Sequence, residues 1–147
     1  MKAGIRFTKE WADEDMVELR IEICDGTSAF TNRIYVAHQL LRDVVEGLHT
    51  FKKQIYGGIF NLRFGEFGSE YASGALDARF QFRKQGKILV RVSAQSGFER
   101  FEEKELASEA TLYLVTEPVL LDEFVHALDA LSEARSDRAE LEAIYWN

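Results

Sequence analysis

Three histidines and one cysteine are the side chains of this sequence that could ligate a metal ion or act as a nucleophile with its base. No two of His38, His49 and His126 stand three or four residues apart, the spacing that would place a pair on one helix face, and none adjoins Cys24. The sequence also lacks CxxC, HExxH, GxSxG, a phosphate-binding loop and GxGxxG after a strand. We therefore expect no metal, no cofactor and no enzymatic activity.

Two arginines are expected to face each other across a hairpin. Apolar and polar residues alternate from Leu76 to Ala94, and a three-residue loop at Lys84–Gly86 would put Arg79 directly opposite Arg91. Like charges in that position repel, so an acidic group is expected nearby. It is either a carboxylate of a neighbouring strand or an anionic ligand or acidic partner surface. The candidate neighbouring carboxylates are Glu18, Glu22 and Glu109.

A glycine-rich segment between Gly65 and Gly74 reads as the longest loop of the chain. It combines the carboxylates Glu66 and Glu70 with two aromatic residues, a composition suited to protein contact. Phe67 and Tyr71 either contact a partner or pack back into the core.

Acidic residues are concentrated toward the C-terminus. The net charge is −7, and eight acidic residues against two arginines give the segment from Glu117 onward −6 of it. This charge disfavours direct contact with nucleic acid and suits either a basic protein partner or a solvated helix face. The candidate partner contacts on this segment are Asp122, Glu123, Asp129 and Glu133. One cysteine and the lack of a leader or membrane-spanning run favour a soluble cytoplasmic protein.

The remaining patterns predict the elements that must position these residues. Strands are expected at residues 5–8, 17–24, 59–64 and 108–116, with a two-residue hairpin loop at Asp25-Gly26 and helices over 37–53 and from Pro118 with Thr116 as cap. Residues 97–107 are expected to be irregular, with Phe98 and Phe101 anchored on the core. The predicted fold is a single α+β domain over residues 1–147, with a helical extension over 136–147. Its strongly twisted antiparallel sheet has about six to seven strands, and two to three helices cover the apolar face.

The order of these patterns resembles the WapI-like family of bacterial immunity proteins. The resemblance rests on the alternating strand Val17-Glu18-Leu19-Arg20-Ile21, the helix with Leu40-Leu41 through Leu48, the hairpin with Gly86, and the last strand leading into Thr116-Glu117-Pro118 and the 121–131 helix. It covers residues 5–131 and is a pattern of hydrophobic positions.

The resemblance implies a protein that binds and neutralises the toxic domain of a bacterial competition system, such as a nuclease. An acidic surface would steer association with a basic toxin and occlude its active site. The alternative is a homodimeric small-ligand-binding or regulatory domain, which dimerisation through Tyr145 and Trp146 would favour.

Overall fold

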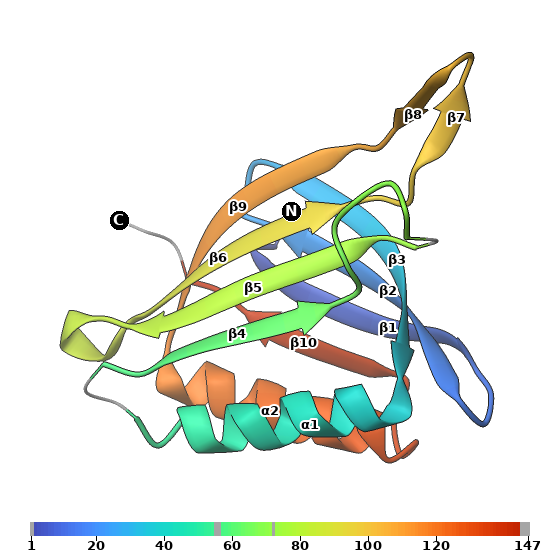
Figure 1. The fold of residues 1–147 in the computed structure, drawn as a ribbon. Helices are drawn as coiled ribbons and strands as arrows, with labels where there is room; N and C mark the ends of the chain where they lie inside the picture. The colour runs from blue at the N-terminus through green and yellow to red at the C-terminus, as the bar shows by residue number, and fades with distance from the viewer. Residues whose placement is uncertain (1, 55–56, 72, 145–147) are drawn as a thin grey trace.

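The computed structural model of the protein describes residues 2–54, 57–71 and 73–144 (Figure 1). These residues form two four-stranded antiparallel sheets, a two-stranded ribbon and two α-helices. Across sheet A the order is β10 (Arg138–Glu142), β1 (Gly4–Ala12), β2 (Met16–Cys24) and β3 (Ala29–Ala37). Across sheet B it is β4 (Ile59–Phe64), β5 (Ala75–Phe82), β6 (Ile88–Gln95) and β9 (Glu109–Thr116). The ribbon is β7 (Glu99–Phe101) with β8 (Lys104–Leu106), and the helices are α1 (His38–Phe51) and α2 (Pro118–Ser132).

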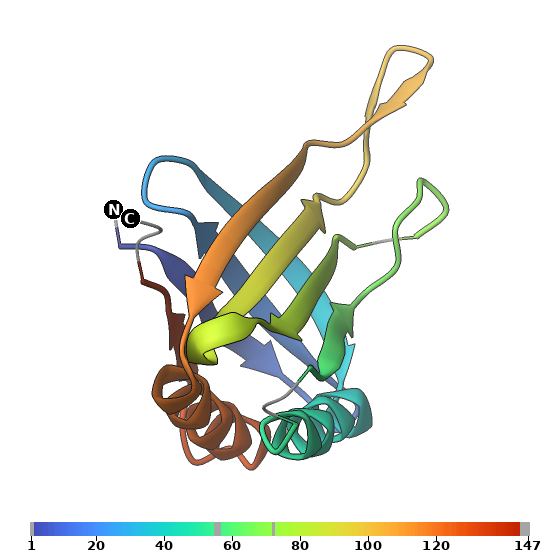
Figure 2. The same cartoon turned by 90° about the vertical axis from the view of Figure 1, so that its left-hand side faces the viewer.

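The two sheets face each other, and the helices lie side by side across one end of the space between them (Figures 1 and 2). Alternation along each strand sends its apolar side chains into this space. Each helix adds a buried stripe spaced by three and four residues, made of Leu41, Val44, Val45, Leu48 and Phe51 on α1 and Leu121, Phe124, Val125, Leu128 and Leu131 on α2.

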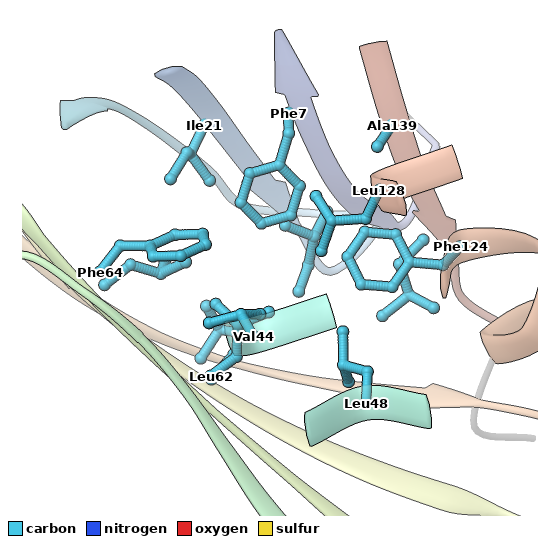
Figure 3. Close-up of a cluster of buried hydrophobic side chains, with 14 of the residues drawn as sticks. Phe7, Ile21, Val44, Leu48, Leu62, Phe64, Phe124, Leu128 and Ala139 are labelled. Atoms are coloured by element: carbon cyan, nitrogen blue, oxygen red, sulfur yellow. The ribbon is translucent and has the colours of Figure 1, made fainter. Parts of the chain in front are cut away.

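Aromatic rings join the layers at the centre of this core. The Phe7 ring of sheet A stacks on Phe124 of α2 at a centroid distance of 5.7 Å and meets the edge of Phe64 of sheet B at 6.0 Å (Figure 3). All three side chains are fully buried. The core is therefore one continuous cluster shared by both sheets and both helices.

The chain repeats one order of elements. Strands β1, β2 and β3 are followed by α1 and β4, and β5, β6 and β9 are followed by α2 and β10. The last strand of each set pairs with the first strand of the other set, since β4 joins β5 and β10 joins β1. Each half of the chain thus supplies an edge strand to the sheet of the other half.

The expected α+β class is confirmed, but the single sheet of six to seven strands is wrong. Ten strands occur in the described residues, divided between two sheets and the ribbon. The division arises because α1 separates β3 from β4, so the meander that ends at β3 cannot continue into β4. The apolar faces of the two sheets then cover each other, and the helices close one end.

The expected helical extension over residues 136–147 is also wrong. Arg138–Glu142 is a strand whose Ala139 and Leu141 point inward, and it pairs with β1. Five alternating residues fit a strand better than a helix, and the open edge of β1 provides the hydrogen-bond partners. Tyr145 and Trp146, expected at a dimer contact, lie outside the described residues.

The two hairpins of the sequence analysis have different outcomes. The β5–β6 register is confirmed at every pair, with Gly86 at φ +69° and Gln85 at φ +64° in the turn. The two-residue loop at Asp25-Gly26 is wrong: Cys24 pairs with Ala29, so the loop has four residues and the register shifts by two. The Asp25 carboxylate explains the longer loop, because it accepts hydrogen bonds from the backbone N–H groups of Ser28 at 2.7 Å and Thr27 at 2.9 Å. A shift of two residues keeps every side chain on its expected face.

The expected cap of α2 is replaced by another contact. Thr116 is fully buried, and its hydroxyl donates to the carbonyl oxygen of Glu142 at 2.8 Å, while Glu117 takes the N-cap position ahead of Pro118. Thr116 therefore ties the end of β9 in sheet B to β10 in sheet A.

Candidate functional site

A groove of about 990 Å³ lies between strands β2 and β3 of sheet A and the loops at the end of sheet B from which the ribbon extends. One wall is the outer face of β2 and β3, and the other is formed by the loop before β5 and by the base of the ribbon. Its lining residues are Arg20, Thr31, Asn32, Arg33, Tyr35, Ser73, Gly74, Ser96, Gly97, Phe98, Glu99, Arg100, Phe101, Leu106, Ala107 and Ser108. We call this site the ribbon groove.

A buried amide fixes the floor of the ribbon groove. The Asn32 side chain points inward from β3, and its Nδ2 donates to the carbonyl oxygens of Gln95 at 2.7 Å and Ala75 at 3.2 Å. These carbonyls belong to sheet B, so one amide joins the sheets where β3 passes β5 and β6. Gly74 is required beside it, because a Cβ there would lie 2.4 Å from the Asn32 side-chain oxygen and 2.7 Å from the Gln95 carbonyl oxygen.

A second buried amide holds the loop over residues 65–74. The Gln95 side chain accepts a hydrogen bond from the backbone N–H of Gly68 at 2.9 Å and donates to the Glu109 carboxylate at 2.7 Å. Sheet B therefore holds both the loop and the start of β9 in fixed positions. Figure 2 shows the loop and the ribbon projecting side by side from this end.

The ribbon β7–β8 projects beyond the body of the molecule (Figure 1), and two of its apolar residues are exposed. Phe101 near its tip is 64% exposed and Leu106 is 49% exposed. The expectations that residues 97–107 are irregular and that Phe101 anchors on the core are wrong, because β7 and β8 pair with each other beyond the ends of β6 and β9. Phe98 is half-buried and lines the groove.

Balanced charges line the β2–β3 wall of the ribbon groove. Arg20 faces Arg33 across the two strands, and the Glu10 carboxylate lies 3.4 Å from the first and 3.9 Å from the second. Arg20 also pairs with Glu22 at 3.2 Å. Next to them, a hydrogen bond to the Glu18 carboxylate, together with its negative charge, raises the pKa of the Tyr35 phenol, which keeps Tyr35 a neutral donor.

The predicted loop contacts lie beside this groove. Glu66 and Glu70 are exposed, and Tyr71 is 44% exposed, so Tyr71 is not packed into the core. Phe67 is half-buried. Three exposed apolar residues, Tyr35, Phe101 and Leu106, line the groove, and Tyr71 is a further exposed aromatic residue on the loop.

The predicted helix contacts lie at the opposite end, and most of them are already paired. Asp122 on α2 lies 2.6 Å from the Lys52 ammonium, and this hydrogen bond lowers the pKa of the Asp122 carboxyl. Asp129 and Glu133 pair with Arg135 at 3.6 Å and 3.2 Å. Glu123 is exposed and has no ion pair with any described residue. The acidic face of α2 is therefore largely neutralised within the chain.

Arg79 and Arg91 are opposite each other on the outer face of sheet B, as the register predicts. None of the three candidate carboxylates lies beside them: Glu18 and Glu22 belong to sheet A, and Glu109 is bound to Gln95. Within residues 2–54, 57–71 and 73–144, no carboxylate forms an ion pair with either arginine. The predicted site residues thus fall on three separate surfaces.

The histidines and the cysteine are not gathered into a site. The described residues contain no group of three or more His, Cys, Asp or Glu side chains that could hold a metal ion. His38 Nε2 contacts the carbonyl oxygen of Asp13 at 2.7 Å, a structural role at the start of α1. Among the helices in the described part of the chain, none has the length and apolar character needed to cross a membrane.

The sequence analysis did not identify the two buried amides that shape the ribbon groove. Asn32 and Gln95 both occupy inward positions of alternating strands, and a polar residue at an apolar position was the signal available. Comparisons of this chain with family models, curated proteins and solved structures gave no match. The groove is therefore described from this structure alone.

Proposed function

We propose that this protein is a non-enzymatic immunity protein that binds a toxin domain of a bacterial competition system in the cytoplasm and blocks its active site. The contact surface in this proposal is the ribbon groove together with the ribbon and the loop over 65–74. The order of strands and helices that resembles WapI-like immunity proteins supports the same class of function.

The observation that carries the proposal is the exposure of two large apolar side chains, Phe101 and Leu106, on a projecting ribbon. Aromatic and aliphatic side chains contribute much of the binding energy of protein interfaces when a partner buries them. Phe101 and Leu106 extend from opposite strands of the ribbon. At its base the Ser96 N–H donates to the Ser108 carbonyl oxygen and the Ser108 N–H donates to the Ser96 hydroxyl, both at 2.9 Å. Such a ribbon can enter a cleft of a partner with little loss of conformational entropy.

The charge of the ribbon suits a basic partner. Four glutamates and two basic residues occupy Glu99–Leu106. An enzyme that cleaves nucleic acid presents a basic cleft, so these glutamates would favour entry of the ribbon there and would steer association. We therefore favour the ribbon over α2 as the contact surface, since the carboxylates of α2 are mostly paired with Lys52 and Arg135.

Growth protection tests this proposal. The chain is co-expressed with the C-terminal domain encoded by the adjacent gene, and survival is compared for the unchanged protein, Phe101→Ala and Val119→Ala. Val119 on α2 is also 64% exposed, so it controls for loss of an exposed apolar side chain. We expect the unchanged protein and Val119→Ala to protect the cells. We expect Phe101→Ala to protect them less, because its affinity for the toxin should fall about tenfold or more. Equal protection by both variants would place the contact elsewhere, and no protection by the unchanged protein would refute the function.

A small-ligand-binding function is the second candidate, favoured by the size of the ribbon groove. Its volume of about 990 Å³ falls at the upper end of the range for small-molecule sites. Native mass spectrometry of the purified protein distinguishes the two functions. A dimer that retains a small molecule would support the second candidate, and a ligand-free monomer would support the first.

A further inference from the structure

We infer a second protein-binding surface on the outer face of sheet B, one that takes an acidic amphipathic helix of a partner. It is independent of the ribbon groove and of the toxin-binding function proposed above. The surface is built on the arginine row, which is the line of facing residues Asn61, Arg79, Arg91 and Tyr113 across β4, β5, β6 and β9.

The arginine row concentrates positive charge in a chain whose net charge is −7. Arg79 and Arg91 occupy directly opposed positions, which costs stability unless an anion lies between or above them. The nearest carboxylate on the same face of β5 is Asp77, and its Oδ2 lies 3.5 Å from Arg63 on β4 instead. Its other oxygen, Oδ1, is buried and has no hydrogen-bond partner among the described residues. In the described part of the chain, no carboxylate therefore lies within ion-pair distance of Arg79 or Arg91.

The outer face of sheet A shows how this chain neutralises such a pair when no partner is needed. Arg20 and Arg33 also face each other, and Glu10 and Glu22 lie within ion-pair distance of them. In the adjacent row, Arg6 bonds Glu22 at 2.8 Å and Glu140 at 3.3 Å. Sheet B has no equivalent carboxylates in its arginine row, where Asn61 and Tyr113 occupy the outer positions.

The Arg79 guanidinium has a donor that the fold does not satisfy. Its Nε is buried and has no hydrogen-bond partner in the described residues. The same holds for Arg20 Nε on sheet A, but that atom lies 3.2 Å from the Glu22 carboxylate, whereas no described carboxylate lies within ion-pair distance of Arg79. A buried donor without a partner destabilises the folded chain. A carboxylate arriving over the arginine row could accept from the guanidinium groups of both Arg79 and Arg91.

The neighbouring residues indicate what else the partner must carry. Two residues along the strands lies a parallel row of Ile59, Gln81, Leu89 and Val115. Ile59 is 45% exposed and Tyr113 is 46% exposed, so both rows are accessible. A partner with an apolar stripe beside its carboxylates would therefore bury apolar area in addition to pairing the charges.

The spacing of the row fits a helix. Neighbouring strands lie about 4.8 Å apart, and carboxylates four residues apart on a helix lie about 5–6 Å apart. A helix lying across β5 and β6 could thus place one carboxylate over each arginine and its apolar stripe over Leu89. A nucleic-acid strand suits this surface less well, since it carries no apolar stripe and is repelled by the acidic remainder of the chain.

A peptide titration tests the inference. The probe is a capped 18-residue helical peptide with glutamates at i and i+4 beside a leucine stripe, and the control peptide has glutamine at the same positions. Binding to the full chain is followed by amide chemical shifts in β5 and β6. We compare the unchanged protein with Arg79→Gln/Arg91→Gln and with Arg42→Gln/Arg138→Gln, in which two exposed arginines of α1 and β10 are replaced. Both double variants carry the same net charge.

We expect shifts localised to the arginine row with the glutamate peptide, and an affinity loss of about tenfold or more for Arg79→Gln/Arg91→Gln alone. Three results would overturn the inference: equal affinity losses in both double variants, equal binding of the glutamine peptide, or tighter binding of single-stranded oligothymidine than of the glutamate peptide. Toxin protection by Arg79→Gln/Arg91→Gln separates this surface from the ribbon groove, because we expect that protection to be unchanged.

Discussion

The two halves of this chain share an order of elements but differ in how they treat their outer faces. In each half a three-strand meander leads into a helix and then into a strand that completes the other sheet. The inner faces are alike, since both are apolar and meet in one core. On the outer face of sheet A, Arg6 and Arg20 lie within ion-pair distance of carboxylates on neighbouring positions, whereas no described carboxylate lies within that distance of Arg79 or Arg91 in the arginine row of sheet B.

This difference lies in the outward residues of the two sheets, which folding constrains less than the inward ones. The core fixes which residues point inward on both sheets, but it places no demand on the outward residues. Sheet A uses its outward residues for pairing within the sheet, and sheet B leaves two arginines available. A shared fold can therefore carry one self-contained face and one face that is complete only with a partner.

The largest expected effect comes from removing the ring that joins the halves. Phe7→Ala should lower the free energy of unfolding by about 3–5 kcal/mol, because it leaves a cavity between Phe124 and Phe64. Urea denaturation followed by both fluorescence and circular dichroism measures it. The two signals should change in a single transition, and two separate transitions would show that the halves are independent units. Phe101→Ala is the control, with an expected change below about 0.5 kcal/mol.

The amide between the sheets should give the next effect. Asn32→Ala leaves the carbonyl oxygens of Gln95 and Ala75 without their donor and should cost about 1–3 kcal/mol. Asn61→Ala on the exposed outer face of sheet B should cost less than about 0.5 kcal/mol. The comparison is made by thermal or urea unfolding, and similar costs for the two asparagines would argue against a joining role for Asn32.

Arginine substitutions on the two outer faces should have opposite signs. Arg20→Gln loses its pairing with Glu10 and Glu22 and should destabilise by up to about 1 kcal/mol at low ionic strength. Arg91→Gln relieves repulsion with Arg79 and should be neutral or stabilising by a few tenths of a kcal/mol. Urea unfolding at low and high salt measures both, and the difference should shrink with salt. Destabilisation by both variants would remove the contrast between the faces.

The smallest expected effect is a loss of stability at acid pH. Hydrogen bonds from the Ser28 and Thr27 backbone N–H groups hold the pKa of Asp25, in the loop between β2 and β3, below its ordinary value of 3.8. Because the folded pKa is the lower one, the stabilisation is complete above that ordinary value and is lost as the pH falls through the folded pKa. Carboxyl-carbon NMR titration measures this pKa. The Lys84–Gly86 turn of sheet B has no carboxylate and should show no such loss, and an Asp25 pKa at or above 3.8 would contradict the argument.

Local sequence patterns predicted those elements whose structure depends on residues close together in the sequence. The β5–β6 register followed from alternation and from the glycine in its turn, and strand β4 was predicted at its observed bounds. The division into two sheets and the pairing of β10 with β1 could not be predicted, because both depend on contacts between residues far apart in the sequence. The loop at Asp25 was missed because its length depends on hydrogen bonds of one side chain.

The candidate site was predicted only in part. The sequence pointed to the loop with Tyr71 and to the facing arginines, both of which are accessible. It did not reveal that Asp122 on α2 is paired, because its partner Lys52 follows α1 and is 70 residues away in the sequence. The ribbon was taken for an irregular segment anchored by Phe101, since a short pair of strands has too few residues to show a clear period.

The exchange of edge strands also governs when each sheet can be completed during synthesis. Sheet B contains β4 to β9 and can assemble from a continuous stretch of chain, but β1 must wait for β10, more than 120 residues later. Until then β1 presents an unpaired edge, which is a template for aggregation or for a chaperone. Such a distant pairing also slows folding. Sheet A, whose outer face carries the paired charges in the folded protein, is thus the last sheet to gain all its strands as the chain leaves the ribosome.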